Sequence, residues 1–441
     1  MREKAPVNLE HLCEDCLTTA YPYGDLRKLK TVFTRHAQQT LASWTPGCCR
    51  ESSREPVFEV IDFFSGCGGM SLGFACLYPL FKVIGGCDID SAAARTFEHN
   101  FNVPTVITDI RALKDDRSLS AFVNKLDRHD EKPLIVVGCA PCQGFSAHRK
   151  KNWHKKDDRN VLVGIMASIA VRLNPECIVM ENVPEILARM YWSHFQEART
   201  IMQDAGYVVR QSIYNAASFG VPQERFRTII IGMKRDFLLP EPLSAHPREY
   251  STVRQAIGHL PPVFPGQKLS DSLHRSARHR SKTIEIMRAV PKNGGSRPQG
   301  IGPKCLDRVR GFSDVYGRLC WDKPAITITH YSRNPASGRF VHPEQNRGLT
   351  MREAALLQSF PYGFEFKGSF DSVFKQIGEA VPPKFACGIA ASVLVELLSP
   401  ALSEQAHIGG IPSVVEPVSN SYSSVIAGLK RTRRQNEIRM R

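Results

Sequence analysis

The chain has 441 residues, with 58 Lys and Arg against 43 Asp and Glu, and a formal net charge of +15 at pH 7. Its composition is typical of a soluble globular protein of two or three domains. We find no apolar segment of membrane-spanning length and no apolar stretch behind the first residues, so we expect neither a membrane protein nor a secreted one. The basic excess predicts a polyanionic partner, with nucleic acid as the first candidate.

The 13 cysteines are scattered along the chain. An odd and scattered set favours reduced thiols and a cytoplasmic setting. Cys13-x-x-Cys16 with Cys48-Cys49 could be imagined as a zinc site. Adjacent cysteines fit the spacing of structural zinc sites poorly, however, so we expect no metal.

Residues 1–55 show no clear periodicity, and a regular alternation of strand-like and helix-like stretches begins at Val57. The predicted strands are residues 57–64, 81–87, 134–138, 177–181 and 228–232. Such an alternation predicts a doubly wound α/β domain.

Regular patterning stops after residue 233. Residues 240–345 are rich in Pro, Gly, Arg and Ser, and between Lys268 and Arg310 eleven Lys or Arg stand against three acidic residues. This concentration suits a phosphate-facing surface, although a solvated basic loop has the same composition. Helices are predicted over 350–359 and 383–398, and the tail after residue 400 is expected to be disordered.

A glycine-rich turn follows the first predicted strand. Val60-Ile-Asp-Phe-Phe64 leads directly into Ser65-Gly-Cys-Gly-Gly69, and strand, glycine turn and helix together are typical of a nucleotide-type cofactor site. Asp88 ends the next strand, at a spacing where an acidic side chain typically accepts hydrogen bonds from ribose hydroxyls. Asp109 ends a third short strand and could reach an adenine amino group. Each aspartate could instead cap a helix.

The segment Gly138-Cys-Ala-Pro-Cys-Gln-Gly-Phe-Ser146 follows the apolar strand 134–138. Open α/β sheets bind their ligands at the carboxyl ends of the strands. Cys142 should lie on the loop at that end, so its thiol is a candidate nucleophile. The alternative is an inert buried thiol.

At this point the motifs resemble those of the cytosine-5 DNA methyltransferases, which use S-adenosylmethionine. Six blocks occur in the order of that family, with the variable basic region between the fourth and the fifth. They are Asp62-Phe-Phe-Ser-Gly-Cys-Gly-Gly69, Pro141-Cys-Gln-Gly-Phe-Ser146, Glu181-Asn-Val-Pro184, Gln223-Glu-Arg-Phe-Arg227, Arg352-Glu-Ala-Ala-Leu-Leu-Gln-Ser-Phe-Pro361 and Ile377-Gly-Glu-Ala-Val-Pro-Pro383. The resemblance covers residues 57–398.

The resemblance implies an α/β fold with a doubly wound, Rossmann-like methyltransferase domain and a smaller target-recognition domain. It divides the chain into an N-terminal extension of unknown role (1–55), a catalytic domain (56–235), a DNA-binding target-recognition domain (236–375), a helix that completes the catalytic domain (376–400) and a basic tail (401–441).

Cytosine methylation explains why these residue types are needed. C5 becomes nucleophilic once a thiolate adds to C6, and Cys142 is the expected thiolate. Glu181 ends the adjacent apolar strand, where burial would raise its pKa and let it protonate N3, although it could be a salt-bridged carboxylate. By family correspondence Arg227 would hold the cytosine O2, with Arg225 supporting the site and Gln143 beside the thiol. Both arginines could otherwise be surface residues.

Two larger sets of contacts follow from the resemblance. A stacked base must be flipped out to reach the thiol, and the basic stretch 147–159 would be the mobile loop that closes over the DNA. The expected cofactor-binding residues are Phe64, Ser65, Gly66, Gly68, Gly69, Asp88, Ile89, Asp109, Ile110, Pro141, Glu379 and Ala380. The expected DNA-binding residues are Ser146, Arg149, Lys150, Lys151, Gln223, Arg278 and Arg280.

Two positions depart from the family pattern. Glu379 stands where an Asn is usual near the methionine end of the cofactor, and Ala140 stands where a second Pro is common. The Glu puts one cofactor contact in doubt and adds negative charge. The catalytic Cys, Glu and Arg positions are retained, so we expect an active enzyme.

The sequence thus predicts a monomeric, sequence-specific DNA cytosine-5 methyltransferase acting on double-stranded DNA in the cytoplasm, at the nucleoid. It would serve a restriction-modification system beside a cognate restriction endonuclease, or act as an orphan methylase. Two alternatives remain. One is a tRNA cytosine-5 methyltransferase, which the long basic region disfavours. The other is a non-catalytic DNA-binding regulator that retains the fold, against which the intact catalytic positions argue.

Overall fold

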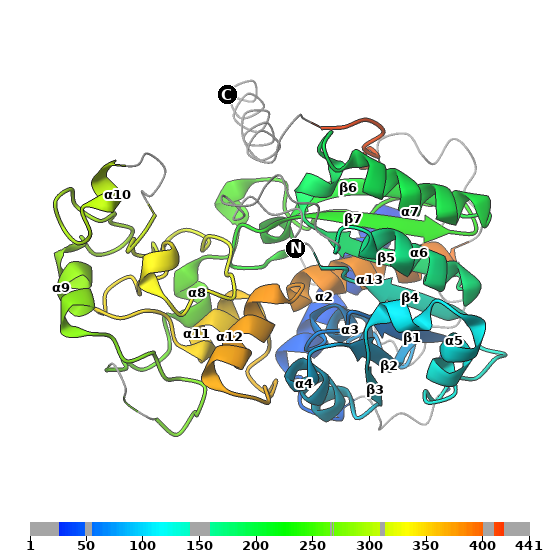
Figure 1. Ribbon diagram of the computed structural model, residues 1–441, viewed down its shortest axis with the longest axis horizontal. Coiled ribbons are helices and arrows are strands. Elements are labelled where there is room, and N and C mark those ends of the chain that lie inside the picture. The colour runs from blue at the N-terminus through cyan, green and yellow to red at the C-terminus, as the bar shows by residue number, and fades with distance from the viewer. Residues whose placement is uncertain are drawn as a thin grey trace, which may run out of the picture.

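The computed structural model describes residues 26–48, 55–141, 159–264, 267, 269–308, 314–399 and 410–418. A seven-stranded sheet forms the core of the part of the molecule drawn at the right of Figure 1. The strands are β1 (Phe58–Phe63), β2 (Phe81–Asp88), β3 (Thr105–Ile107), β4 (Leu134–Gly138), β5 (Cys177–Asn182), β6 (Val208–Asn215) and β7 (Phe226–Met233). All five strands that the sequence predicts with explicit bounds are present. The β6 strand was not predicted.

The strand order is β3-β2-β1-β4-β5-β7-β6. The first five strands in this order are parallel, whereas β7 is antiparallel to both β5 and β6. The order reverses at β1 and β4, and ligands of doubly wound sheets bind at such a switch point. The carboxyl ends of β1, β2, β4 and β5 therefore lie along one edge of the sheet, and the predicted α/β class is confirmed.

Helices cover both faces of the sheet (Figure 1). One buried apolar cluster includes α3 (Gly69–Ala75) and α13 (Pro383–Leu398), and the other includes α6 (Leu162–Arg172) and α7 (Trp192–Asp204). The helices α4 (Ser91–Phe101) and α5 (Asp116–Val123) follow β2 and β3. Every residue of β1 and β4 is buried, because a parallel sheet covered on both faces has no solvent side.

An N-terminal helix, α2 (Leu26–Ala42), packs against α13, although residues 1–55 gave no helical signal. Lys30 lies on its buried face and interrupts the apolar stripe that would have indicated a helix. Lys30 Nζ pairs with Glu396 Oε1 at 2.6 Å and donates to Leu238 O at 2.8 Å. Burial lowers the pKa of Lys30, and the Glu396 carboxylate opposes that shift. The N-terminal segment is thus attached to the last helix of the sheet region.

Part of the C-terminal tail is also ordered, so the expectation of disorder is wrong for residues 410–418. Val414 N donates to Gln211 O at 2.9 Å, and Gln211 N donates to Ser413 Oγ at 3.1 Å. Gln211 belongs to β6, which is an edge strand, and an edge strand has backbone groups that need partners. Farther along, Val418 N donates to Leu187 O at 3.0 Å. The tail therefore covers the edge of the sheet. The rest of residues 401–441 lies outside the described residues.

Residues Phe370–Leu398 form a 29-residue helical run that is long and apolar enough to cross a membrane, which the sequence analysis did not anticipate. Its most apolar window is 83% buried inside the protein. The run consists of α12 (Phe370–Glu379) and α13, and α13 belongs to the core beside the sheet. Burial inside the protein accounts for its apolar character.

The loop-rich region, which we define as residues 240–369, lies beside the sheet and contains short helices in its described part (Figure 1). They are α8 (Val253–Ile257), α9 (Ser281–Ala289), α10 (Cys305–Arg308) and α11 (Met351–Leu357). This agrees with the loss of periodicity that the sequence shows after residue 233.

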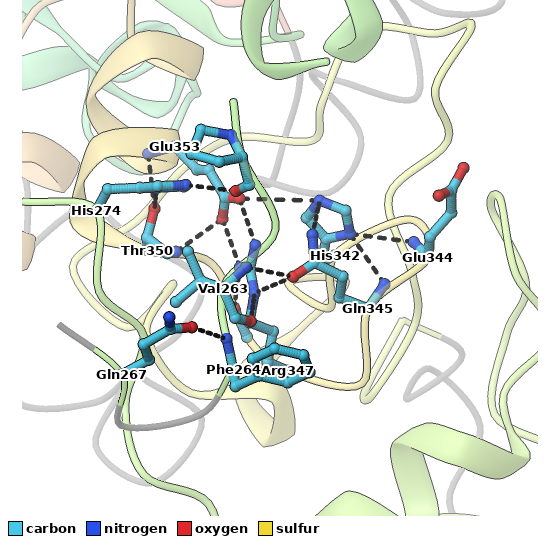
Figure 2. A network of polar contacts seen from close by, with 12 residues as sticks. Val263, Phe264, Gln267, His274, His342, Glu344, Gln345, Arg347, Thr350 and Glu353 are labelled. Carbon is cyan, nitrogen blue, oxygen red and sulfur yellow. Dashed lines mark hydrogen bonds and ion pairs between the residues drawn. The ribbon is translucent and has the colours of Figure 1, made fainter. Parts of the chain in front are cut away.

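A buried polar network holds the loop-rich region together (Figure 2). Arg347 donates from Nη1 and Nη2 to the Glu353 carboxylate at 2.8 and 2.7 Å, and from Nε to Val263 O at 3.0 Å. Glu353 also accepts from Thr350 N at 2.8 Å and so completes the capping box that begins α11. Burial alone would raise the pKa of Glu353, but the Arg347 charge holds it at about 2. Burial lowers the pKa of the neighbouring His342 to about 4.

Candidate active site

The turn after β1 is built from backbone conformations that most residues avoid. Phe64, Gly66 and Gly68 have φ angles of 56°, 53° and 95°. A Cβ at Gly68 would lie 2.2 Å from an atom of the Phe101 ring, so packing requires glycine there. A Cβ at Gly66 would have nothing within 4 Å. Gly66 thus borders open space, which leaves its backbone accessible to a ligand.

Asp88 joins the end of β2 to this turn. Its Oδ2 accepts from Gly66 N at 2.8 Å and its Oδ1 accepts from Asp90 N at 2.8 Å. Burial raises the pKa of Asp88, and these two hydrogen bonds oppose the shift. The next side chain, Ile89, is 71% exposed. An open glycine turn, a carboxylate that retains lone pairs and an exposed apolar side chain together fit a nucleoside-bearing cofactor.

Asp109 and Ile110 fit the cofactor prediction less well. Asp109 Oδ1 accepts from Arg111 N at 2.9 Å, so it caps a short 3-10 helix, η3 (Ile110–Leu113). This is the helix-capping alternative that the sequence left open. Ile110 is buried in an apolar cluster, and the structure therefore offers its backbone, not its side chain, as the group that a cofactor could contact.

The end of α12 lies against the glycine turn. A Cβ at Gly69 would lie 2.3 Å from Val381 O and 3.1 Å from Ala380 Cβ. Glu379, the last residue of α12, is exposed. Segments far apart in the sequence are therefore neighbours here, as expected if Glu379 and Ala380 border the cofactor. Direct cofactor contacts by these residues stay predictions.

Sequence reasoning missed Asp62 as a functional candidate. It is 1% exposed, its Oδ2 accepts from Ser71 Oγ at 2.5 Å, and its Oδ1 has no hydrogen-bond partner within the described ranges of the chain. Burial raises its pKa to about 7, with a further contribution from nearby Asp88. β1 contains two buried acidic residues, and its sequence alone does not distinguish Asp62 from Glu59, which is paired with Arg128. Asp62 is therefore a group that can bind a proton in the strand that leads into the glycine turn.

Glu181 and Arg227 meet on neighbouring strands of the same sheet. Glu181 lies in β5 opposite Ile229 of β7, two residues from Arg227, so both side chains project from one face. Arg227 Nε lies 2.7 Å from Glu181 Oε1, and both side chains are almost buried. β4, which leads toward Cys142, pairs with β5 on its other side. The prediction that Glu181 could be salt-bridged therefore holds in this structure.

Several predicted residues lie outside the described part of the chain. Pro141, partly buried, is the last described residue before this segment. The residues outside it are Cys142, Gln143, Ser146, Arg149, Lys150 and Lys151, together with Cys13, Cys16 and Cys49 of the zinc site considered above. Their assignments stay predictions.

Arg225 and Gln223 are structural in this geometry. Arg225 is 2% exposed and donates to the backbone carbonyls of Ile328, Gly378 and Ala380 at 2.9 to 3.1 Å. It therefore joins the sheet to two distant segments, and its predicted electrostatic role stays untested. Gln223 needs a correction, because its side chain is fully buried and is not available to DNA.

The buried Gln223 side chain ties the loop-rich region to the sheet region. Its Nε2 donates to Leu357 O at 3.0 Å, and its Oε1 accepts from Ile328 N at 2.8 Å. Polar residues are usually placed at the surface in sequence reasoning, which explains the wrong prediction. Arg278 and Arg280, in contrast, are exposed just before and at the start of α9, as a DNA contact requires.

Comparisons with known proteins agree with this arrangement. The C-5 cytosine-specific DNA methylase family matches residues 58–394. A type II methylase, M.HgiDII, from Herpetosiphon aurantiacus is 33% identical over 348 residues, covering 76% of this chain and 95% of the relative. A type II methyltransferase, M1.HphI, from Haemophilus parahaemolyticus is 37% identical over 340 residues, covering 76% and 86%.

A crystal structure described as a DNA modification methyltransferase of an E. coli prophage shares the fold, with a TM-score of 0.61 at 24% identity. It covers 78% of this chain and the whole of the other. The family match spans the sheet, the glycine turn, the Glu181–Arg227 pair and the loop-rich region. The chain therefore belongs to the family of C-5 cytosine-specific DNA methylases and is a DNA cytosine-5 methyltransferase that uses S-adenosylmethionine.

Proposed function

We propose that the enzyme methylates a flipped-out cytosine through a covalent bond between the Cys142 sulfur and cytosine C6. The observation that carries this proposal is the Glu181–Arg227 pair at 2.7 Å, at the end of β5 and next to the strand that leads to Cys142. A base-recognising acid and a guanidinium beside the nucleophile's loop are what activation of cytosine needs. The proposal assigns residues 236–375 to target recognition and residues 56–235 with 376–400 to catalysis.

Each group has a defined task in this scheme. The Cys142 thiolate adds to C6, and Glu181, which starts as the ion-paired carboxylate, takes a proton from solvent and passes it to N3, where negative charge develops. Arg227 contacts Glu181 through Nε, and its Nη1 donates to Phe226 O at 2.7 Å. The remaining N–H groups on the Nη atoms would donate to the cytosine O2. After methylation, loss of the C5 proton expels Cys142, and a bound water is our candidate for the base.

The glycine turn, Asp88, Ile89 and the 379–381 segment would hold S-adenosylmethionine, which supplies an electrophilic methyl group when bound. Asp88 would accept from the ribose hydroxyls with lone pairs that its two backbone contacts leave free. The exposed Ile89 would pack against the adenine. The closeness of Gly69 to Val381 would keep this side of the pocket narrow.

A mechanism-based substrate tests the covalent step. DNA containing 5-fluorocytosine should stop the reaction after methyl transfer, because fluorine cannot leave C5 as a cation. A denaturation-resistant enzyme–DNA adduct should form with the wild type and be absent with Cys142→Ala. Glu181→Gln should bind the cofactor normally and transfer methyl groups at least about a hundredfold more slowly. Adduct formation by Cys142→Ala would overturn the assignment.

We further propose that the enzyme acts as a monomer in the modification arm of a restriction-modification system. The relatives described as type II methylases support this proposal. Bisulfite sequencing of host DNA that expresses the protein should show one methylated sequence. A cognate endonuclease should fail to cut that DNA. Methylation of a matched tRNA instead of duplex DNA would favour the RNA alternative, and unchanged cellular function of Cys142→Ala would favour the regulator.

A further inference from the structure

A second carboxyl group lies close to the catalytic pair. Glu185 belongs to η4 (Pro184–Leu187), the short helix that follows β5 and begins three residues after Glu181. Its side chain is only 1% exposed, and its neighbours Ile186 and Leu187 belong to a buried apolar cluster. Glu185 Oε2 has no hydrogen-bond partner among the residues that the structure describes. The carboxyl accepts a hydrogen bond from its own backbone N–H, but a buried carboxylate with an unsatisfied oxygen is costly, so the group needs either a proton or a nearby cation.

The nearby cation is Arg227. Burial raises the pKa of Glu185 to about 8, and a hydrogen bond from its own backbone N–H and then the Arg227 charge oppose this shift. Arg227, however, is already in contact with Glu181 at 2.7 Å. At neutral pH Glu185 is therefore a neutral acid, and Glu181 retains the guanidinium as an ion-pair partner.

Other charges near η4 come from the elements that pack against it. η4 packs on α7 and β7, and the tail segment 410–418 reaches it through Val418 N and Leu187 O. The ionisable groups on these elements are His194, Glu197, Arg199, Asp204, Arg227 and Glu416, and Glu181 lies on β5. Among them Arg227 is the charge that acts on the Glu185 carboxyl. Ionisation of Glu185 would thus be felt first at the Glu181–Arg227 pair.

We propose that Glu185 is a positioning residue that, as a neutral acid, leaves the Arg227 guanidinium committed to Glu181. Once Glu185 ionises, two carboxylates compete for one guanidinium. Arg227 is then drawn away from the orientation in which it contacts Glu181 and can donate to the cytosine O2. This inference rests on the proposed roles of Glu181 and Arg227. Glu185 itself touches neither substrate nor cofactor in this scheme.

The pH profile of methyl transfer tests the proposal. Glu185→Gln keeps the shape of the neutral acid but cannot ionise. With a pKa of about 8, about nine-tenths of wild-type Glu185 is ionised at pH 9. The kcat ratio of Glu185→Gln to wild type should therefore be near one at pH 7 and rise to about tenfold at pH 9. Glu185→Asp, which can ionise, should keep an alkaline decline. Glu176→Gln is the matched control, since it removes an exposed carboxylate at the other end of β5, and it should follow the wild type.

Melting temperatures give a second readout that needs no catalysis. The raised pKa means that folded wild type loses stability as pH rises from about 4.5 toward about 8. The melting temperature of Glu185→Gln relative to wild type should increase over that window and then level off. A kcat ratio that stays constant from pH 7 to pH 9 would overturn the proposal, even with a normal melting result. Absence of methyl transfer by the wild type would instead refute the proposed function. In that case, a melting-temperature difference between Glu185→Gln and wild type that does not change with pH would show that Glu185 does not titrate.

Discussion

The sheet region buries carboxyl groups both singly and in pairs, whereas the buried Glu353 of the loop-rich region is held by a pair. In the sheet region, Asp62 and Glu185 are single carboxyls inside apolar surroundings, and burial raises the pKa of both. In the loop-rich region, Glu353 is buried too, but two hydrogen bonds from Arg347 keep it ionised, with a pKa of about 2. Isolated buried acids bind protons in the working pH range, whereas paired ones hold structure.

The contrast has a structural cause. Strands of the sheet satisfy their backbone groups through each other, so an apolar core is enough to hold them. The described part of the loop-rich region has isolated bridges instead of such a ladder, and side chains supply the missing partners. Arg318, for example, donates to the carbonyls of Val290, His342 and Gln345 at 2.7 to 3.0 Å. A fold held this way depends on a few polar residues.

The largest expected effect is at the buried pair of the loop-rich region. Arg347→Met leaves the Glu353 carboxylate buried without its partner, which typically costs about 3–5 kcal/mol. DNA binding should be lost, while S-adenosylmethionine binding to the sheet region should persist, as measured by calorimetry. Arg333→Met is the matched control, because its ion pair with Asp371 is exposed and should cost less than about 1 kcal/mol. An equal loss of stability in Arg347→Met and Arg333→Met would contradict the contrast between the two regions.

Replacing the buried Asp62 of the sheet region should stabilise the protein, whereas Arg347→Met should destabilise it. Folded Asp62 has a pKa of about 7, well above its unfolded value, so the wild type loses stability as pH rises from about 4 to about 7. Asp62→Asn cannot ionise, and its stability relative to wild type should improve by about 2 kcal/mol between pH 5 and pH 8. Thermal unfolding of the cofactor-free protein at both pH values measures this. A difference that does not change with pH would show that Asp62 does not titrate.

Replacing two surface arginines should have a smaller effect than the two buried changes above, and it should affect DNA binding but not cofactor binding. Arg278 and Arg280 are exposed, and each contact with a phosphate contributes about −0.9 to the slope of log K against log salt. The double variant Arg278→Gln with Arg280→Gln should lower the magnitude of that slope by about 2, with cofactor affinity unchanged. Lys234→Gln in the sheet region, an exposed ion-pair residue, should leave the slope as it is. An unchanged slope in the double variant would show that the DNA phosphates do not contact Arg278 and Arg280.

The smallest effect is expected at the cofactor end of α12. Glu379→Asn should leave the dissociation constant for S-adenosylmethionine unchanged or lower it slightly, because Glu379 is exposed and its charge is screened by solvent. Isothermal titration calorimetry measures this directly. A clear rise in the dissociation constant would show that Glu379 makes a favourable contact of its own.

The sheet was largely predictable from sequence because its buried strands are continuous apolar runs. β6 was missed, since Arg210, Gln211 and Ser212 interrupt its pattern and the tail covers its edge. α2 was missed because Lys30 sits on its buried face. In both cases the partner that makes the element stable lies far away in the sequence.

The candidate site was predictable where a motif is local. The glycine turn and Asp88 come together through adjacent strands, and Glu181 and Arg227 through β5 and β7. Gln223 was misplaced because its partner Ile328 lies about a hundred residues away in a region without periodicity. Glu185 and Asp62 were overlooked because a charged residue in an apolar run indicates nothing until its surroundings are known.

The packing of α2 on α13 affects the order in which the protein can be completed during synthesis. Lys30 emerges from the ribosome long before its partner Glu396. Until then α2 has neither its counter-charge nor the apolar face of α13, and the lysine remains in water. Domains generally fold as units as the chain emerges. In this enzyme α2 therefore reaches its final position only after α13 has been made, and a nascent chain that stops before α13 cannot close its core.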